Sequence, residues 1–107
     1  MKYLVMGSNG PTGTTPEDMI EILEDLVLPG LDALIRLESE NMVLAGGVPV
    51  SERGVAFIVD APSNEELDQL LRNLPLWEIL EWQVTPLQTF EGRAFQERRT
   101  IQQLKKR

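Results

Sequence analysis

The stretch GVAFIVDAPSNEELDQLLRNLPLW, residues 54–77, decides the fold of this chain. Residues 54–61 form an apolar run rich in β-branched side chains, which predicts a strand. Ser63, followed three residues later by Glu66, is a capping box, the pattern that opens a helix. Pro75 ends that helix because proline cannot continue it. Between cap and stop lies an apolar stripe with helical spacing, made of Leu67, Leu70, Leu71 and Leu74.

The chain before this stretch contains a strand, a long helix and a second strand. Residues 2–7, KYLVMG, predict the first strand. Thr15 is a suitable N-cap with proline after it, and apolar residues spaced by three and four follow as far as Ile35. Pro29 should kink or split this helix, because it removes a hydrogen bond and crowds the preceding turn. Residues 41–49 predict the next strand, joined to 54–61 by a hairpin connection.

A last strand over residues 78–88 completes the order β-α-β-β-α-β. This order predicts an α+β fold of the ferredoxin-like βαββαβ type, with a four-stranded antiparallel sheet and both helices on one face. We expect the domain to span residues 1–90. Residues 91–107 form a basic C-terminal tail that we expect to be helical and to dock on the body or on a neighbouring subunit.

The strand at 54–61 has apolar side chains on both faces, whereas helices can cover only one of them. Val55, Phe57 and Val59 alternate with Ala56 and Ile58. An apolar sheet face left open must pack against something, and a second copy of the sheet is the simplest candidate. The pattern therefore predicts a homodimer or a larger assembly.

Composition excludes several classes of chemistry. The 107 residues contain neither cysteine nor histidine. Triads built on serine or cysteine with histidine are therefore excluded, and a zinc site would have to be made of carboxylates alone, a ligand set that zinc rarely uses. No apolar run is long enough to cross a membrane, and the first residues lack the features of a secretory signal, so we expect a cytoplasmic protein.

The net charge of −7 is divided unevenly along the chain. Residues 1–87 carry 15 acidic and 4 basic side chains, a net of −11, whereas residues 88–107 carry 2 acidic and 6 basic ones, a net of +4. An acidic body argues against nucleic-acid binding, which needs cations to neutralise phosphates. The basic tail is better suited to an acidic protein surface.

The segments VDAPSNEEL (59–67), LPLW (74–77) and VTPL (84–87) resemble the second half of the muconolactone isomerase family. The resemblance implies a cofactor-free protein with the dimeric α/β-barrel form of the ferredoxin-like fold, which assembles into larger rings. It also implies a proton shift within a small unsaturated lactone. The chain departs from the family in lacking histidine, in its glycine-rich loop after the first strand and in its basic tail.

Four residues are candidates for a site. Glu81 lies in the middle of the last strand, where burial inside a dimeric barrel would suit it to proton transfer and an edge position would leave it solvated. Tyr3 either packs in the core or stabilises an enolate as a catalytic acid. Arg53 either is solvated in its hairpin or holds a ligand carboxylate. Trp77, after the helix stop, closes the core or forms the wall of a substrate pocket.

Two functions from different classes fit these residues. One is a cofactor-free isomerase acting on a small acidic lactone or a related organic molecule. The other is a non-catalytic oligomeric module of the same fold that binds a small molecule or serves assembly. Cofactor-independent oxygenation, as in related barrel proteins, has no residue signal in this chain.

Overall fold

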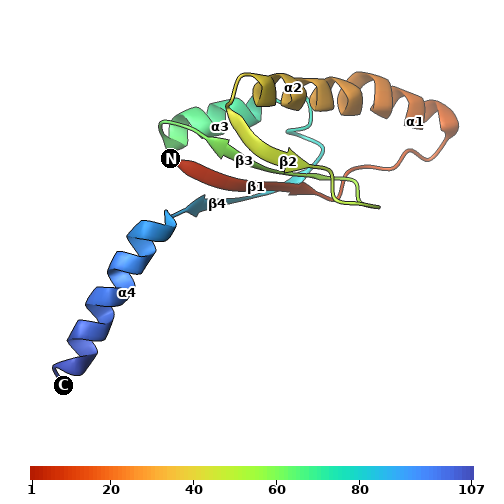
Figure 1. Cartoon of the computed structure of the whole chain (residues 1–107). Coiled ribbons are helices and arrows are strands. Elements are labelled where there is room, and N and C mark those ends of the chain that lie inside the picture. Colours follow the sequence, from red (N-terminus) through yellow and green to blue (C-terminus); the bar gives the residue numbers. More distant parts are fainter.

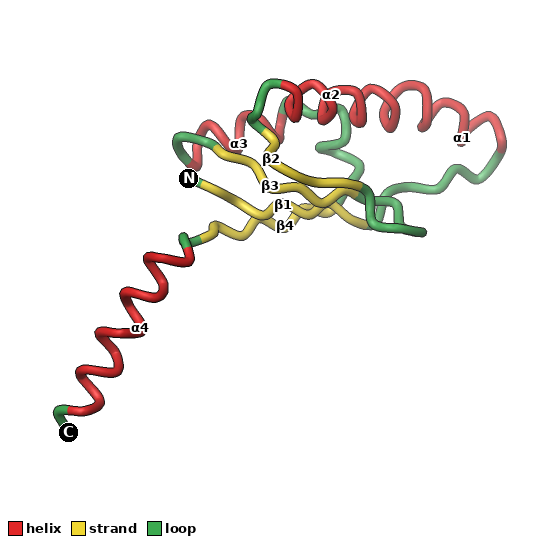
Figure 2. The backbone as a smooth tube through the Cα atoms, in the orientation of Figure 1, coloured by secondary structure: helices red, strands yellow, loops and turns green.

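The structure, a computed structural model, describes residues 1–107 and confirms the α+β βαββαβ order (Figure 1). The strands pair in the order β2-β3-β1-β4, and every pair is antiparallel. The helical segments before β4 all lie on one face of the sheet (Figure 2). The elements are β1 (Lys2–Ser8), α1 (Pro16–Ile22), the π-helical segment η1 (Leu23–Val27), α2 (Leu28–Ser39), β2 (Val43–Gly47), β3 (Val55–Asp60), α3 (Asn64–Arg72), β4 (Glu81–Leu87) and α4 (Phe90–Lys105).

The core lies between the helices and the sheet face that carries Val5, Phe57 and Val59. Val5 is paired with Phe57 across β1 and β3, so both side chains point toward the helices. From the helical side, Leu67, Leu71 and Leu74 complete the core, as their spacing predicted. No polar or charged side chain is buried.

The two predicted helix starts are confirmed. The Thr15 hydroxyl accepts a hydrogen bond of 3.1 Å from the backbone N–H of Asp18. The Ser63 hydroxyl accepts one of 3.2 Å from the backbone N–H of Glu66. Each bond satisfies one of the free N–H groups at a helix N-terminus.

The first helix is divided just ahead of Pro29, by a widening of its turn. In η1 the hydrogen bonds span five residues, and the N–H of Leu28 donates to the carbonyl of Leu23. Pro29 has no N–H, and its ring would press on the carbonyl four residues earlier in a regular helix. A π turn at this point accommodates the proline while the axis continues into α2.

The last strand begins later than the sequence indicates, at Glu81 instead of residue 78. Residues 73–80 form successive turns, in which the N–H of Trp77 donates to the carbonyl of Leu74 and that of Ile79 to Leu76. Apolar side chains in these turns pack against the core. Because a short apolar run has the same sequence pattern in a turn as in a strand, the sequence placed the start of the strand too early.

The other face of the sheet carries Leu4, Met6 and Ile58, and no helix covers it (Figure 2). Beyond β4, α4 projects away from the body and contacts no other element (Figure 1). The chain is consequently elongated, measuring 67 Å by 27 Å by 22 Å. None of its helices is both long and apolar enough to span a membrane.

Candidate functional site

A cavity of about 180 Å³ lies between the helical layer and the sheet, at the end where β1 finishes and β3 begins. Its walls come from α1, η1, α2, the loop after β1, the β2–β3 connection and the turns before β4. They are largely apolar, and the only charged side chains among them are Glu52 and Arg53. The apolar lining comprises Pro11, Met19, Ile22, Leu23, Val27, Leu31, Val48, Val55, Leu76, Ile79 and Leu80.

The glycine-rich loop after β1 closes one side of this cavity. The N–H of Gly10 donates a hydrogen bond of 2.8 Å to the carbonyl of Arg53. A Cβ at position 10 would lie 2.9 Å from that same carbonyl oxygen, which is closer than a side chain tolerates. The glycine thereby lets the loop after β1 attach directly to the β2–β3 connection.

The β2–β3 connection brings two opposite charges to the cavity. It turns at Ser51, which has a φ of 67°, and the N–H of Glu52 donates to the carbonyl of Pro49 over 3.1 Å. Glu52 and Arg53 are both exposed, and neither takes part in any of the three ion pairs of the chain. Both side chains are therefore free to meet a ligand at the cavity mouth.

The LPLW segment contributes Leu76, and not Trp77, to the cavity wall. Leu76 is buried and packs on α2 at Gly30, where a Cβ would overlap its side chain. Trp77 stacks on Trp82 with ring centroids 5.8 Å apart and lies outside the cavity lining. The Arg72 guanidinium sits 5.5 Å from the Trp77 ring centroid, and the Trp82 Nε1–H donates to the Trp77 carbonyl over 2.9 Å. These contacts give Trp77 a structural role at the edge of the hydrophobic core.

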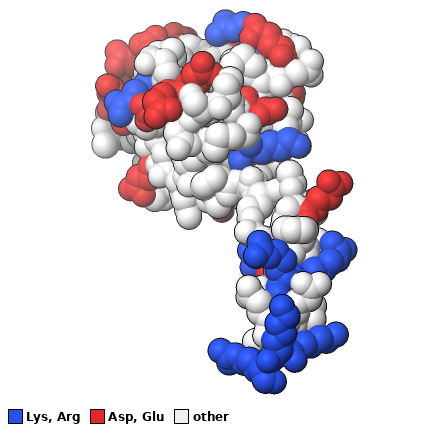
Figure 3. All heavy atoms as spheres, turned by 90° about the vertical axis from the view of Figure 1, so that its left-hand side faces the viewer, with Lys and Arg blue, Asp and Glu red and all other residues white.

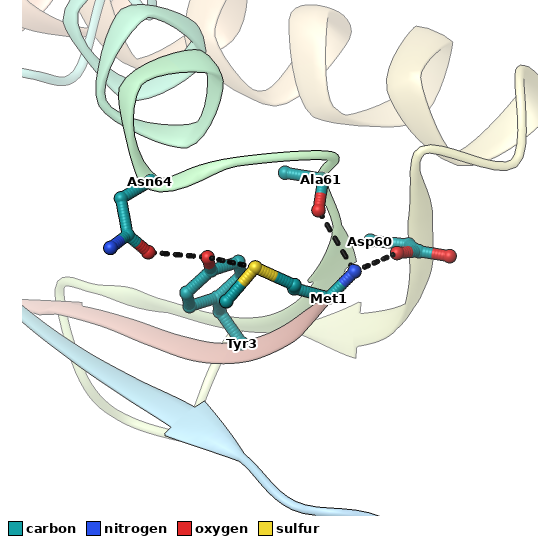
Figure 4. A network of polar contacts seen from close by, with 5 residues as sticks. All are labelled: Met1, Tyr3, Asp60, Ala61 and Asn64. Carbon is teal, nitrogen blue, oxygen red and sulfur yellow. Dashed lines mark hydrogen bonds and ion pairs between the residues drawn. The ribbon is translucent and has the colours of Figure 1, made fainter.

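Tyr3 lies near the start of β1, at the opposite end of the sheet from the cavity, and Figure 4 shows its polar neighbours. Its ring is buried, and its hydroxyl donates to Oδ1 of Asn64 and lies 3.5 Å from Sδ of Met1. The amino group of Met1 in turn lies 3.1 Å from Oδ1 of Asp60. The structure thus places Tyr3 in the core with its hydroxyl satisfied.

Glu81 lies at the first position of β4, on the uncovered face of the sheet. It pairs with Ser8, its side chain is exposed, and its Oε2 accepts a hydrogen bond of 2.8 Å from Nδ2 of Asn9. It does not line the cavity, and its role in proton transfer stays a prediction.

Of the four candidates from the sequence, only Arg53 lies at the cavity, and the structure adds Glu52 beside it. The sequence places both residues in a hairpin connection, where charged side chains are ordinarily solvated. The sequence feature that could have indicated a site is an acidic residue directly followed by a basic one, in a loop that lies opposite a glycine-rich segment. Clusters of three or more acidic side chains that could hold a metal ion are absent.

Comparisons with known proteins agree with this architecture. The family model of muconolactone delta-isomerase matches residues 36–93, more than half of the chain. The crystal structure of muconolactone isomerase superposes with a TM-score of 0.68 at 21% identity, over 83% of this chain and 90% of that one. The 5-chloro-2-hydroxyhydroquinone dehydrochlorinase of Burkholderia phenoliruptrix, solved with 2,5-dihydroxybenzoquinone, gives 0.63 at 16% identity, over 86% and 98%. No curated protein sequence matches the chain.

Proposed function

The chain belongs to the muconolactone delta-isomerase family, and from this premise we propose that it is a cofactor-free isomerase. Its substrate would be a small, acidic, unsaturated ring compound, a lactone or a related molecule. The two structural relatives are named for reactions of such compounds, since muconolactone and 5-chloro-2-hydroxyhydroquinone are both small unsaturated rings with acidic groups.

The observation that carries the proposal is the cavity itself, with its apolar walls and one acid–base pair at its mouth. A dry cavity of roughly 150 Å³ holds one benzene ring, so a volume of about 180 Å³ suits a single substituted ring. The apolar walls would receive the ring carbons. The Arg53 guanidinium would pair with the carboxylate of the ligand at the mouth, where water remains available to the charged ends.

Proton transfer falls to Glu52 in this arrangement. Its carboxylate would take a proton from a ring carbon next to the double bond, and the electron pair of that C–H bond would delocalise toward the ring carbonyl. Glu52 would then return the same proton to a different carbon, so that the double bond moves and no atom is gained or lost. Arg53 would stabilise the negative charge that develops between the two steps.

A kinetic assay with muconolactone tests this assignment. Glu52→Gln keeps the size of the side chain and removes the base, so we expect kcat to fall by about 10²- to 10⁴-fold. Arg53→Gln should both raise KM and lower kcat, because it removes the contact to the bound carboxylate and the stabilisation of the charge that develops during proton transfer. The comparison variant is Glu81→Gln, at the other exposed glutamate that is a candidate for proton transfer, and its activity should stay near that of the wild type if Glu52 is the base.

The reverse effects of these two glutamate variants on turnover would assign the proton transfer to Glu81. If Glu81→Gln abolished turnover and Glu52→Gln did not, the cavity pair would not be the proton-transfer site. Circular dichroism of all three variants would show whether each retains the native fold.

The second candidate function is a non-catalytic binding module. It is favoured by the scarcity of polar groups in the cavity, where only one carboxylate and one guanidinium are present. A module of this kind would bind muconolactone or 2,5-dihydroxybenzoquinone in calorimetry, with a loss of affinity in Arg53→Gln, and would leave both compounds unchanged.

A further inference from the structure

The α4 helix carries an apolar stripe that nothing in the chain covers. Positions 90, 94, 97, 101 and 104 alternate in steps of four and three, the spacing of one helix face, and all but Glu97 are apolar. Phe90 is 97% exposed, Ile101 51% and Leu104 57%. An isolated helix of 16 residues is only marginally stable in water. A partner surface for this face would therefore stabilise it.

A groove of matching character lies between α2 and α3. Its volume is about 510 Å³, and its apolar floor includes Leu37, Leu70 and Leu74. The charged side chains around it are Arg36, Glu40, Asp60 and Glu66, so acidic groups outnumber basic ones three to one. The groove extends along about two turns of each helix, from residue 33 to 40 and from residue 66 to 73.

We propose that residues 98–107 of one chain lie in the α2–α3 groove of a second copy. Five of the six cations of the tail fall within these ten residues, on either side of Ile101 and Leu104. Ile101 and Leu104 would contact the apolar floor, while the cations would face the acidic rim. Pairing of two α4 helices with each other is disfavoured, because each tail carries a net charge of +4.

The linker before α4 directs the helix away from its own body. Only Gln88 and Thr89 separate β4 from α4. The Thr89 hydroxyl accepts from the N–H of Gly92 over 2.9 Å, and the Gln88 side chain donates to Gln96 over 2.8 Å. Both linker residues are thus bonded to the helix that follows. Figure 3 shows the basic tail standing apart from the acidic body. The groove that receives the tail would therefore belong to another chain.

Disulfide trapping tests the inference, since the chain contains no cysteine of its own. Two single-cysteine proteins are mixed, one with Thr100→Cys beside the α4 stripe and one with Gln69→Cys at the groove. We expect a mixed disulfide dimer to form at micromolar concentration. Gln83→Cys, on the uncovered sheet face, is the matched control and should form little mixed dimer with Thr100→Cys.

A charge exchange gives a second readout in the same cysteine background. Glu66→Lys in the Gln69→Cys protein, or Arg98→Glu in the Thr100→Cys protein, should lower the yield of mixed dimer several-fold. The two charge changes together should restore that yield. Three results would overturn the inference: no mixed dimer from folded proteins, preferential linkage of Thr100→Cys to itself or to Gln83→Cys, or a linkage within a single chain carrying both cysteines. The inference concerns assembly and does not depend on isomerase activity.

Discussion

At the scale of single residues, the carboxyl of Asp18 has a pKa below its ordinary value of 3.8. The Thr14 hydroxyl, 2.7 Å from its Oδ2, lowers the pKa of Asp18 by donating to the charged form, and Thr15 adds to the effect. A lowered pKa stabilises the folded state at pH values above the pKa of the unfolded chain. That stabilisation is lost as the pH falls through the pKa of the folded state. Thr14→Val should therefore raise the pKa of Asp18 toward 3.8 in an NMR titration. Thr100→Val on α4 is the control, and an unchanged Asp18 titration in Thr14→Val would contradict the assignment.

Residues whose partners lie nearby in the chain were the predictable ones. The caps Thr15 and Ser63 each bond three residues ahead, and both were identified from the sequence. The hydroxyl of Tyr3 has its acceptor 61 residues away, and Gly10 closes one side of the cavity by bonding to Arg53, 43 residues away. Such long-range approaches leave no local pattern. The sequence therefore singled out Arg53 but gave no reason to select its neighbour Glu52, which also lines the cavity.

At the scale of elements, the end of α2 depends on one residue with a left-handed backbone. Asn41 has a φ of 62°, its N–H donates to the carbonyl of Glu38, and the N–H of Met42 donates to that of Leu37. These two bonds form a Schellman motif, in which glycine is the preferred residue at the left-handed position. We expect Asn41→Gly to change the free energy of unfolding by less than about 1 kcal/mol, in the stabilising direction. Asn41→Val should lower it by about 1–2 kcal/mol, because a β-branched side chain is strained there.

Urea denaturation measures both changes. Asn73 is the matched control, since it also follows a helix but has a φ of −82° in the right-handed region. Asn73→Gly should therefore gain nothing. A gain from glycine at both positions would show that the backbone conformation of Asn41 is not the cause.

Element order was predictable for the same local reasons, and element boundaries were less so. Capping and stop signals placed α3 between Ser63 and Pro75. The response of the first helix to Pro29 was predicted as a kink or split, and only the structure shows that it is a π turn. The start of β4 depends on whether Ile79 packs under the helices or pairs in the sheet, which is decided by tertiary contacts.

At the scale of the whole molecule, the chain presents an uncovered apolar sheet face and a projecting basic helix. The sequence indicated the apolar face through strand alternation and a basic helical tail through charge division. It gave no sign that the tail projects, because the direction of α4 depends on the short linker before it. On the uncovered face Met6 is 43% exposed and lies on β1, one of the two central strands. We predict that two copies pack through this face and form the dimeric barrel that the family resemblance implies.

Met6→Glu tests this packing, because in a two-fold dimer it brings two like charges toward the same apolar interface. The wild type should sediment at micromolar concentration as a dimer or a larger species. Met6→Glu should shift toward smaller species while keeping its circular dichroism spectrum. Ile20→Glu is the matched control, since Ile20 is 53% exposed but lies on α1, away from the sheet face, and its mass should equal that of the wild type. A wild type that sediments as a stable folded monomer would contradict the prediction, and a loss of mass in Ile20→Glu alone would place the interface on the helices.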